Sequence, residues 1–245
     1  MLAARANIAM FDGLKGAAEE ALGHVREAAE EMDALADNDM TPQLIQALSA
    51  LVLAEASVER YAEADRRAKR GLRLARRLGL GYQFLLLRFA QAGALIMQGQ
   101  LGEARRAADE VSEAALLLAN DQLLAMATGM GCWVASLEGD MAAALAMGQD
   151  AVEAAGRARS SRSAWLAYVS HGAALIDAGQ YELGRREILA MSGPDLDHVP
   201  PIARPLYYRS LTIAELAAGR IEAAEAMAGR AEATGAGVDP DELGG

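Results

Sequence analysis

Apolar residues recur along the chain at helical spacing, in stretches that alternate between two types. The first type is apolar on almost every side, as in 85–98, where Leu85, Phe89, Ala92 and Ile96 form one stripe. The second type has one apolar and one charged face, as in the stretch 101–119 that follows. This alternation predicts antiparallel helix pairs, each with a more buried first helix and a more exposed second helix.

A glycine recurs every 40 residues between the two helices of a pair, at Gly99, Gly139, Gly179 and Gly219, and Glu59 takes the same place one step earlier. The residue five positions after each turn is small: Ala64, Ala104, Ala144, Gly184 and Ala224. The residue seven positions before each turn glycine is also small: Ala92, Cys132, Gly172 and Thr212. A fixed period of this length is typical of a solenoid built from one stacked supersecondary unit. Small residues where helices cross let the two backbones approach closely.

The pattern predicts twelve helices in six pairs: Ala3–Phe11 with Lys15–Ala36, Pro42–Ala56 with Arg60–Leu78, Leu85–Gln98 with Leu101–Ala119, Leu124–Glu138 with Met141–Arg157, Ala164–Ala178 with Tyr181–Met191, and Pro205–Ala218 with Ile221–Thr234. We therefore predict an all-α, right-handed superhelix of about six antiparallel helix pairs. It forms a single helical-repeat domain over 1–245, with repeats near 1–40, 41–80, 81–120, 121–160, 161–203 and 204–237.

The 40-residue step fails in two places. The first pair turns at Asp12-Gly13, 46 residues before Glu59, and the segment 38–42 absorbs the difference. The second helix of the fifth pair ends early, and an irregular proline loop follows it through Pro201. Both places are expected positions of a bend.

Composition supports an all-helical chain, because 53% of the residues are hydrophobic, only 4% are aromatic, and β-branched residues are sparse. The net charge of −11 predicts that most of the surface repels nucleic acid. One cysteine, Cys132, excludes an intramolecular disulfide and suits the cytoplasm. The longest uncharged run, 123–137, is too short to span a bilayer, and the N-terminus has no apolar core of a signal peptide.

The pattern Gly-(Asp/Gln/Arg)-x-x-x-Ala, with its flanking small residues, resembles the tetratricopeptide repeat, although the standard repeat has 34 residues. The longer repeat resembles the helical domains of bacterial MalT-like transcription regulators. The stretches 59–64, 132–140 and 223–233 are similar to the large ATP-binding members of the LuxR family. This resemblance covers roughly 10–235.

Members of that family carry an N-terminal nucleotide-binding switch domain and a C-terminal helix-turn-helix. This chain has no Gly-x-x-x-x-Gly-Lys-(Ser/Thr) phosphate loop and no basic recognition helix. We therefore expect no cofactor here, with ATP bound only in an N-terminal domain that this chain lacks. The end at 238–245 lacks a polar capping helix, which suggests an excised piece or a truncated relative.

On the tetratricopeptide template, six residues on first helices are expected to face the concave side and to contact a ligand or partner: Leu86, Phe89, Met126, Trp133, Val169 and Arg209. Trp133 would lie there beside Gly129, or would pack as core between helices. Arg209 could hold a carboxylate or phosphate, or could pair with Glu215 or with a solvent-facing acid.

Four arginines, Arg66, Arg70, Arg73 and Arg77, form one face of the second helix in the second repeat, and Arg67, Lys69 and Arg76 widen the patch. The patch is a candidate for docking an acidic partner domain or nucleic acid, or it is an ordinary solvated face. If it is functional, another domain of the same regulator is favoured over DNA.

No pattern typical of catalysis or metal binding is present. His24, His171 and His198 are scattered, and the sequence contains no nucleophile elbow and no HExxH motif. Cys132 is expected to be a buried small hydrophobe. We therefore predict no catalytic and no metal-ligating residues.

The expected function is that of a non-catalytic sensor or interaction segment in a cytoplasmic transcription regulator. Its partner would be a protein, another domain of the same regulator or a small effector, with no direct contact to nucleic acid or membrane. The alternative is a stand-alone tetratricopeptide-like scaffold for protein–protein interaction. An all-α enzyme of the terpene-synthase type is disfavoured, because Asp-Asp-x-x-Asp clusters are missing.

Overall fold

The computed structural model describes residues 1–158 and 165–235. Twelve α-helices and no strand form within these residues, so the predicted all-helical class is confirmed. The helices group into two compact units, and we describe each by itself. The handedness of a superhelix across both units stays a prediction.

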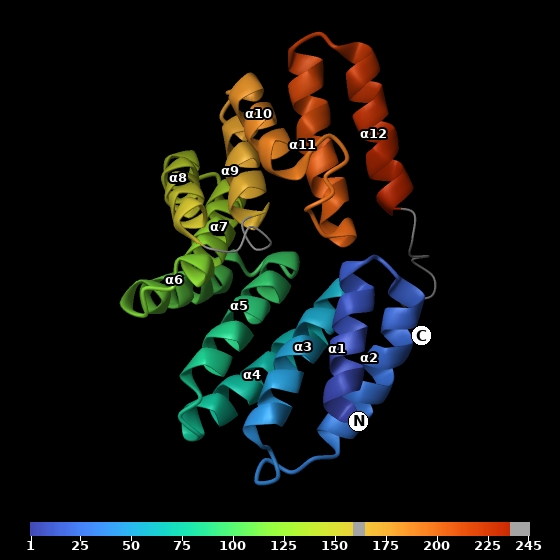
Figure 1. Ribbon diagram of the computed structural model, residues 1–245, viewed down its shortest axis with the longest axis vertical. Helices are drawn as coiled ribbons and strands as arrows, with labels where there is room; N and C mark the ends of the chain where they lie inside the picture. The colour runs from blue at the N-terminus through green and yellow to red at the C-terminus, as the bar shows by residue number, and fades with distance from the viewer. Residues whose placement is uncertain (159–164, 236–245) are drawn as a thin grey trace. The chain divides into compact units, whose positions relative to one another are not determined.

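The N-terminal unit comprises Met1–Ala107 (blue to green in Figure 1). Its helices are α1 (Leu2–Leu14), α2 (Ala18–Asp33), α3 (Pro42–Ser57), α4 (Tyr61–Arg77), α5 (Gly81–Met97) and the first part of α6 (Leu101–Leu117). Helix α3 packs against α1, α4 and α5. The core of this unit draws on α1 to α5, with Val25, Ile45, Leu48, Leu51 and Leu87 fully buried.

The C-terminal unit begins at Ala108 (green to red in Figure 1). After the end of α6 it contains α7 (Asp121–Glu138), α8 (Met141–Arg157), α9 (Trp165–Asp177), α10 (Tyr181–Ser192), a short 3-10 helix (Pro201–Ala203), α11 (Arg204–Ala217) and α12 (Ile221–Gly235). Successive helices pack as antiparallel neighbours, most clearly α7 with α8 and α11 with α12.

The turns inside the pairs repeat the same backbone geometry every 40 residues. Gly99, Gly139, Gly179 and Gly219 have φ between 71° and 80°, and Glu59 has φ 61°. The residue after each turn donates its backbone N–H to the carbonyl five positions earlier, at 2.8–3.0 Å, which closes a left-handed helix cap. The 40-residue period in the sequence therefore reflects one helix cap that is repeated at each turn. Glu59 adopts the same left-handed conformation, with a steric cost that glycine avoids.

Two small positions of the repeat meet where α9 crosses α10. A Cβ atom added to Gly184 would lie 2.3 Å from the carbonyl oxygen of Gly172 and 2.8 Å from a side-chain carbon of Ile176. No side chain fits there without moving backbone, as the small-residue pattern predicts.

The predicted turn at Asp12-Gly13 is wrong, because α1 continues through both residues to Leu14. Gly13 is a packing residue instead: a Cβ atom there would lie 1.8 Å from Oγ of Ser57 on α3. The first turn is at Gly16, with φ 79° and an N–H of Ala17 bonded to the Asp12 carbonyl at 2.9 Å. The first turn therefore precedes the turn at Glu59 by 43 residues rather than 46.

Other helix boundaries differ from the predictions by a few residues. Helix α5 begins four residues earlier than predicted, at Gly81, and α7 begins at Asp121 because Asn120 caps it, accepting from the Leu123 N–H at 3.0 Å. Residues 159–163, which separate the fourth and fifth predicted helix pairs, and the C-terminal segment 238–245 lie outside the described residues. No described helix is both long and apolar enough to cross a membrane.

Candidate interaction site on helix α4

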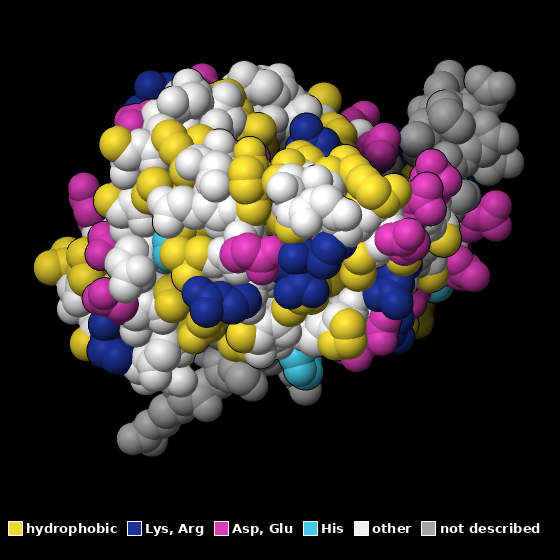
Figure 2. All heavy atoms as spheres, turned by 90° about the horizontal axis from the view of Figure 1, so that it is seen from above, with side chains coloured by type: hydrophobic (Ala, Val, Ile, Leu, Met, Phe, Trp, Pro, Cys, Tyr) yellow, Lys and Arg dark blue, Asp and Glu magenta, His cyan; other side chains and the backbone are white. Residues whose placement is uncertain are grey.

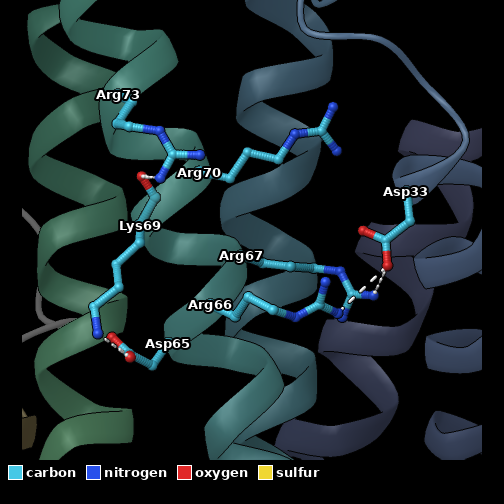
Figure 3. Close-up of a pocket in the computed structure, with 7 residues that line it drawn as sticks. All are labelled: Asp33, Asp65, Arg66, Arg67, Lys69, Arg70 and Arg73. Atoms are coloured by element: carbon cyan, nitrogen blue, oxygen red, sulfur yellow. Dashed lines mark hydrogen bonds and ion pairs between the residues drawn. The ribbon is translucent and has the colours of Figure 1, made fainter.

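A hollow of about 450 Å³ lies on the surface of α4 beside the end of α2. Its lining consists of five cationic and two acidic side chains: Arg66, Arg67, Lys69, Arg70, Arg73, Asp33 and Asp65 (Figure 3). A surplus of positive charge is therefore gathered in one place on a chain whose net charge is −11. We call these residues the α4 pocket.

The spacing of α4 explains why its cations share one side. Arg66, Lys69, Arg70 and Arg73 are three, four and seven residues apart, which places them on neighbouring turns. The opposite side of α4 contributes Ala64, Ala68, Leu72 and Ala75 to the core of the N-terminal unit. Burial of these apolar residues fixes the rotation of the helix and turns the cations outward.

Arg67 is the inner cation of the pocket and is almost fully buried. It donates from one terminal nitrogen to Glu55 of α3 and from the other to Asp33 of α2, the latter at 2.6 Å. Glu55 is fully buried, and its second carboxylate oxygen has no partner. Burial therefore raises the pKa of Glu55 to about 7, although the charges of Arg67 and Arg60 act to lower it.

Arg70 and Arg77 hold the segment that follows α2. Arg70 donates to the carbonyls of Met32 and Leu35 at 3.0 and 2.6 Å and to the carboxylate of Asp37 at 2.9 Å. Arg77 donates to the Asp37 carbonyl at 2.6 Å. These carbonyls lie at and after the C-terminal end of α2, where no helical N–H remains to bind them and the helix dipole favours cations. Two of the four arginines predicted to dock a partner therefore bind the first helix pair of the same chain.

Asp65 connects the pocket to α5. It accepts from Lys69 at 2.5 Å and from the buried amide of Gln91 at 2.7 Å, and Gln91 accepts in turn from Arg88 at 2.7 Å. The hydrogen bond to Asp65 is the main reason why the pKa of Lys69 lies above its ordinary value. Lys69 therefore stays charged, and the polar network ties α4 to α5.

The outer cations of the pocket are exposed to solvent. The side chains of Arg66 and Lys69 are 63% and 53% exposed, and Arg73 is exposed one turn further along. Arg66 approaches Asp33 at 3.4 Å, and Arg73 donates to the Lys69 carbonyl at 3.3 Å. Such side chains keep donors available to an anionic surface, while Arg67 and Arg70 fix the inner wall.

The predicted concave-face residues are divided between the two units. Leu86 and Phe89 are half-buried on α5, and Met126 and Trp133 are half-buried on α7. Gly129, expected beside Trp133 on an open face, is buried: a Cβ atom there would lie 3.2 Å from the Cα atom of Ala167 on α9. This face of α7 is therefore partly covered by the next first helix.

The prediction that Val169 faces the concave side is wrong, because Val169 is fully buried in the core of the C-terminal unit. Arg209 is exposed on α11 and does not bind Glu215. That glutamate accepts from Arg185 at 2.5 Å and from Arg220. The prediction that Arg209 contacts an anion stays open, while its predicted pairing with Glu215 is wrong.

Cys132 and His171 are buried in the C-terminal unit. Burial raises the pKa of the Cys132 thiol to about 12, with Glu187 and Asp177 adding to the shift, so the reactive thiolate is suppressed. His171 approaches Glu187 with an N–O distance of 2.6 Å. Within 1–158 and 165–235, no cluster of three potential metal ligands was found.

The acidic partners of the site's cations were not predicted: Asp33, Asp37, Glu55 and Asp65. Glu55 and Asp33 bind Arg67 from helices 12 and 34 residues away in the sequence. A signal for Glu55 existed, because Glu55-x-x-x-x-Arg60 recurs four repeats later as Glu215-x-x-x-x-Arg220. Asp33 gave no such signal, because it lies in the pair that breaks the 40-residue step.

One face of the molecule carries charges of both signs. On the face drawn in Figure 2, basic and acidic side chains lie among hydrophobic and uncharged ones, and neither sign covers a large area. The lining of the α4 pocket, by contrast, has five cations and two acids.

The fold has counterparts among solved structures. No protein family matches the chain, and no curated protein matches it. BtubC (BKLC) from P. vanneervenii is similar in structure, with a TM-score of 0.62, 16% identity, and coverage of 91% of this chain and 94% of that one. The apo form of RapI is similar with a TM-score of 0.63, 10% identity, and coverage of 95% and 98%. Both are helical-repeat proteins, and at these identities they show the fold alone.

Proposed function

We propose that this chain is a non-catalytic interaction scaffold of a regulatory protein, and that it binds an acidic surface of another protein domain at the α4 pocket. The observation that carries the proposal is the gathering of five cations around one open hollow in an acidic chain. Three of them, Arg66, Lys69 and Arg73, are exposed to a partner.

Electrostatic complementarity of this kind gives specificity and a fast encounter. The inner wall of the pocket is already ordered, because Arg67 and Arg70 are bound to α2 and the segment after it. A partner therefore orders only the outer side chains, which limits the entropy lost on binding.

The resemblance described in the sequence suggests that the regulatory protein is a large ATP-binding member of the LuxR family. In that setting the acidic surface belongs to another domain of the same polypeptide, and the repeats transmit an effector signal to it. The alternative is a stand-alone scaffold whose partner is a separate protein. The reading frame around this segment separates the two: an upstream phosphate loop or a downstream helix-turn-helix favours the regulator.

Calorimetry tests the proposal directly. The chain is titrated with the domains encoded beside it, or, if none exist, with the products of adjacent genes. We expect Arg66→Glu together with Arg73→Glu to weaken binding about tenfold or more, because two attractive contacts become repulsive. The control is Arg26→Glu with Arg186→Glu, which makes the same charge change at exposed arginines of α2 and α10. Equal loss in both variants would show a net-charge effect and would refute the α4 pocket as the docking site.

A small effector on the first helices is a second candidate function, favoured by the half-buried Trp133 on α7 and the exposed Arg209 on α11. Such a ligand acts only if it binds two packing states of the repeats with different affinity. In a Trp165→Phe background, Trp133 is the only fluorophore of its kind. We expect candidate effectors to change its emission and to lose affinity in Arg209→Ala. Binding that is unchanged both in Arg209→Ala and in Trp133→Ala would exclude this face.

A further inference from the structure

The acidic surface that the proposed function requires exists on the chain itself. Eighty residues after Arg70 and Arg73, at the same places two repeats later, the sequence has Asp150 and Glu153. Both acids are exposed on α8, and Gln149 stands where Lys69 stands on α4. The second helices of the second and fourth repeats therefore present opposite charges at matching positions.

The acids of α8 border a groove. This groove of about 380 Å³ in the C-terminal unit is lined by the apolar residues Leu116, Leu124 and Met147 and by Ser112, Thr128, Asp150, Glu153 and Arg157. Arg157 is bound to Asp121 at 3.0 Å, so its charge is compensated. We call this feature the α8 groove, and its free charge is negative.

Exposed leucines lie at the end of α6, and one of them, Leu116, lines the α8 groove. Leu116, Leu117 and Leu118 follow one another at the end of α6 and are 63%, 89% and 60% exposed. Leu116 therefore adds an exposed apolar side chain to the apolar lining of the groove, which a bound helix would cover. On the α4 side, the aliphatic stems of Arg66 and Arg73 supply apolar contact beneath their charges.

Resting on the proposed function of the α4 pocket, we propose that its partner is the α8 groove of a second copy of this chain. Helix α4 lies along the groove of the other copy as one ridge between α6 and α8. Arg66 and Arg73 are about 10 Å apart along α4, a span over which they can reach the acids that border the groove. Leu116 of α6 packs against the arginine stems.

The apolar contact is essential to this arrangement, because exposed ion pairs alone contribute little to stability. The charges fix which surfaces meet, since two α4 pockets or two α8 grooves repel each other. If each copy uses both surfaces toward one partner, the pair closes; if toward two different partners, longer assemblies form. Both cases are self-association through the same two surfaces.

Sedimentation equilibrium of the full chain tests the proposal over roughly 10 µM to 1 mM, the weak end of specific association. We expect reversible self-association. We expect the dissociation constant to rise at least tenfold both in Arg66→Glu with Arg73→Glu and in Asp150→Arg with Glu153→Arg. The four changes combined exchange the two charges and are expected to restore association. The control, Arg186→Glu with Glu225→Arg, exchanges charges at exposed sites elsewhere and is expected to leave it unchanged.

Circular dichroism of each variant verifies that the helices remain folded. A wild-type chain that stays monomeric throughout overturns the proposal, as does association that neither reversal weakens or that the combined variant fails to restore. These outcomes are separate from the calorimetric test of the proposed function. A monomeric chain that still binds a neighbouring domain through Arg66 and Arg73 would refute self-docking and leave the proposed function intact.

Discussion

Glu55 and Glu215 occupy the same position of the repeat, four repeats apart, but their hydrogen bonds to arginine differ between the two units. Both are buried and both bind arginine. Glu55 binds Arg67 through one oxygen only, and the other oxygen has no partner. Glu215 accepts from Arg185 through one oxygen and from Arg220 through the other.

The pKa values of the two glutamates shift in opposite directions. Burial raises the pKa of Glu55 to about 7. Burial also acts to raise the pKa of Glu215, but the hydrogen bonds from Arg185 and Arg220 outweigh it, so that pKa lies below its ordinary value. Two differences separate the glutamates: Glu55 is more deeply buried, and only Glu215 has both oxygens bound by arginine.

The largest expected effect comes from removing the partner of Glu55. We expect Arg67→Ala to lower the free energy of unfolding by about 3–5 kcal/mol, because it leaves the buried carboxyl group of Glu55 without a hydrogen-bond partner and without a compensating charge. Arg185→Ala is expected to cost less, because Glu215 keeps Arg220. Urea unfolding followed by circular dichroism measures both. Arg67→Met with Glu55→Leu is the control and is expected to recover most of the loss, since it removes both charges together. Equal losses in Arg67→Ala and Arg185→Ala would end the distinction between the two sites.

The next effect is on the pH dependence of stability. Because Glu55 takes up its proton more readily in the folded chain, its ionisation destabilises the fold as pH rises from about 4.5 to about 7, by about 3 kcal/mol at most. Glu215 has the opposite sign: its stabilisation is present above pH 4.5 and is lost as pH falls through its lowered pKa.

Urea midpoints measured from pH 4 to pH 8 distinguish these signs. Glu55→Gln is expected to remove the fall in stability between pH 4.5 and 7, and Glu215→Gln is expected to leave that fall in place. Tryptophan emission reports on the C-terminal unit separately, since Trp133 and Trp165 both lie there. An unchanged profile in Glu55→Gln would show that Glu55 is not the titrating group.

A smaller effect concerns the close helix contacts of the two units. Gly184→Ala is expected to destabilise the C-terminal unit by about 1–3 kcal/mol, because the new methyl group meets the backbone oxygen of Gly172 at 2.3 Å. In the N-terminal unit, a methyl group at Gly71 meets only the ends of Leu87 and Leu48, at 2.8 and 2.9 Å, which can move. Gly71→Ala is therefore expected to cost less, as thermal unfolding of both variants can verify. Gly93→Ala, which meets nothing within 4 Å, controls for helix propensity and is expected to stabilise α5.

The α4 pocket was only partly predictable, because the sequence shows which arginines share a helix face but not what they bind. The sequence placed Arg66, Arg70, Arg73 and Arg77 on one face, which helical spacing alone requires. It did not show that Arg70 and Arg77 bind carbonyls at and after the end of α2, which lie 35 to 40 residues away. The same contacts hold the first helix pair, where the 40-residue step fails.

By itself, the sequence determined the all-helical class, the pairing of helices and the turns that repeat every 40 residues. These depend on local physics: apolar spacing within a helix, and left-handed caps that glycine adopts without strain. Only the tertiary structure decided that Gly13 is a packing residue, that Val169 is core, and which charges are neutralised and which remain exposed. Those outcomes depend on which side chains of distant helices meet, because a charge or a small residue has the same local pattern whether its neighbour is water, a carbonyl or another helix.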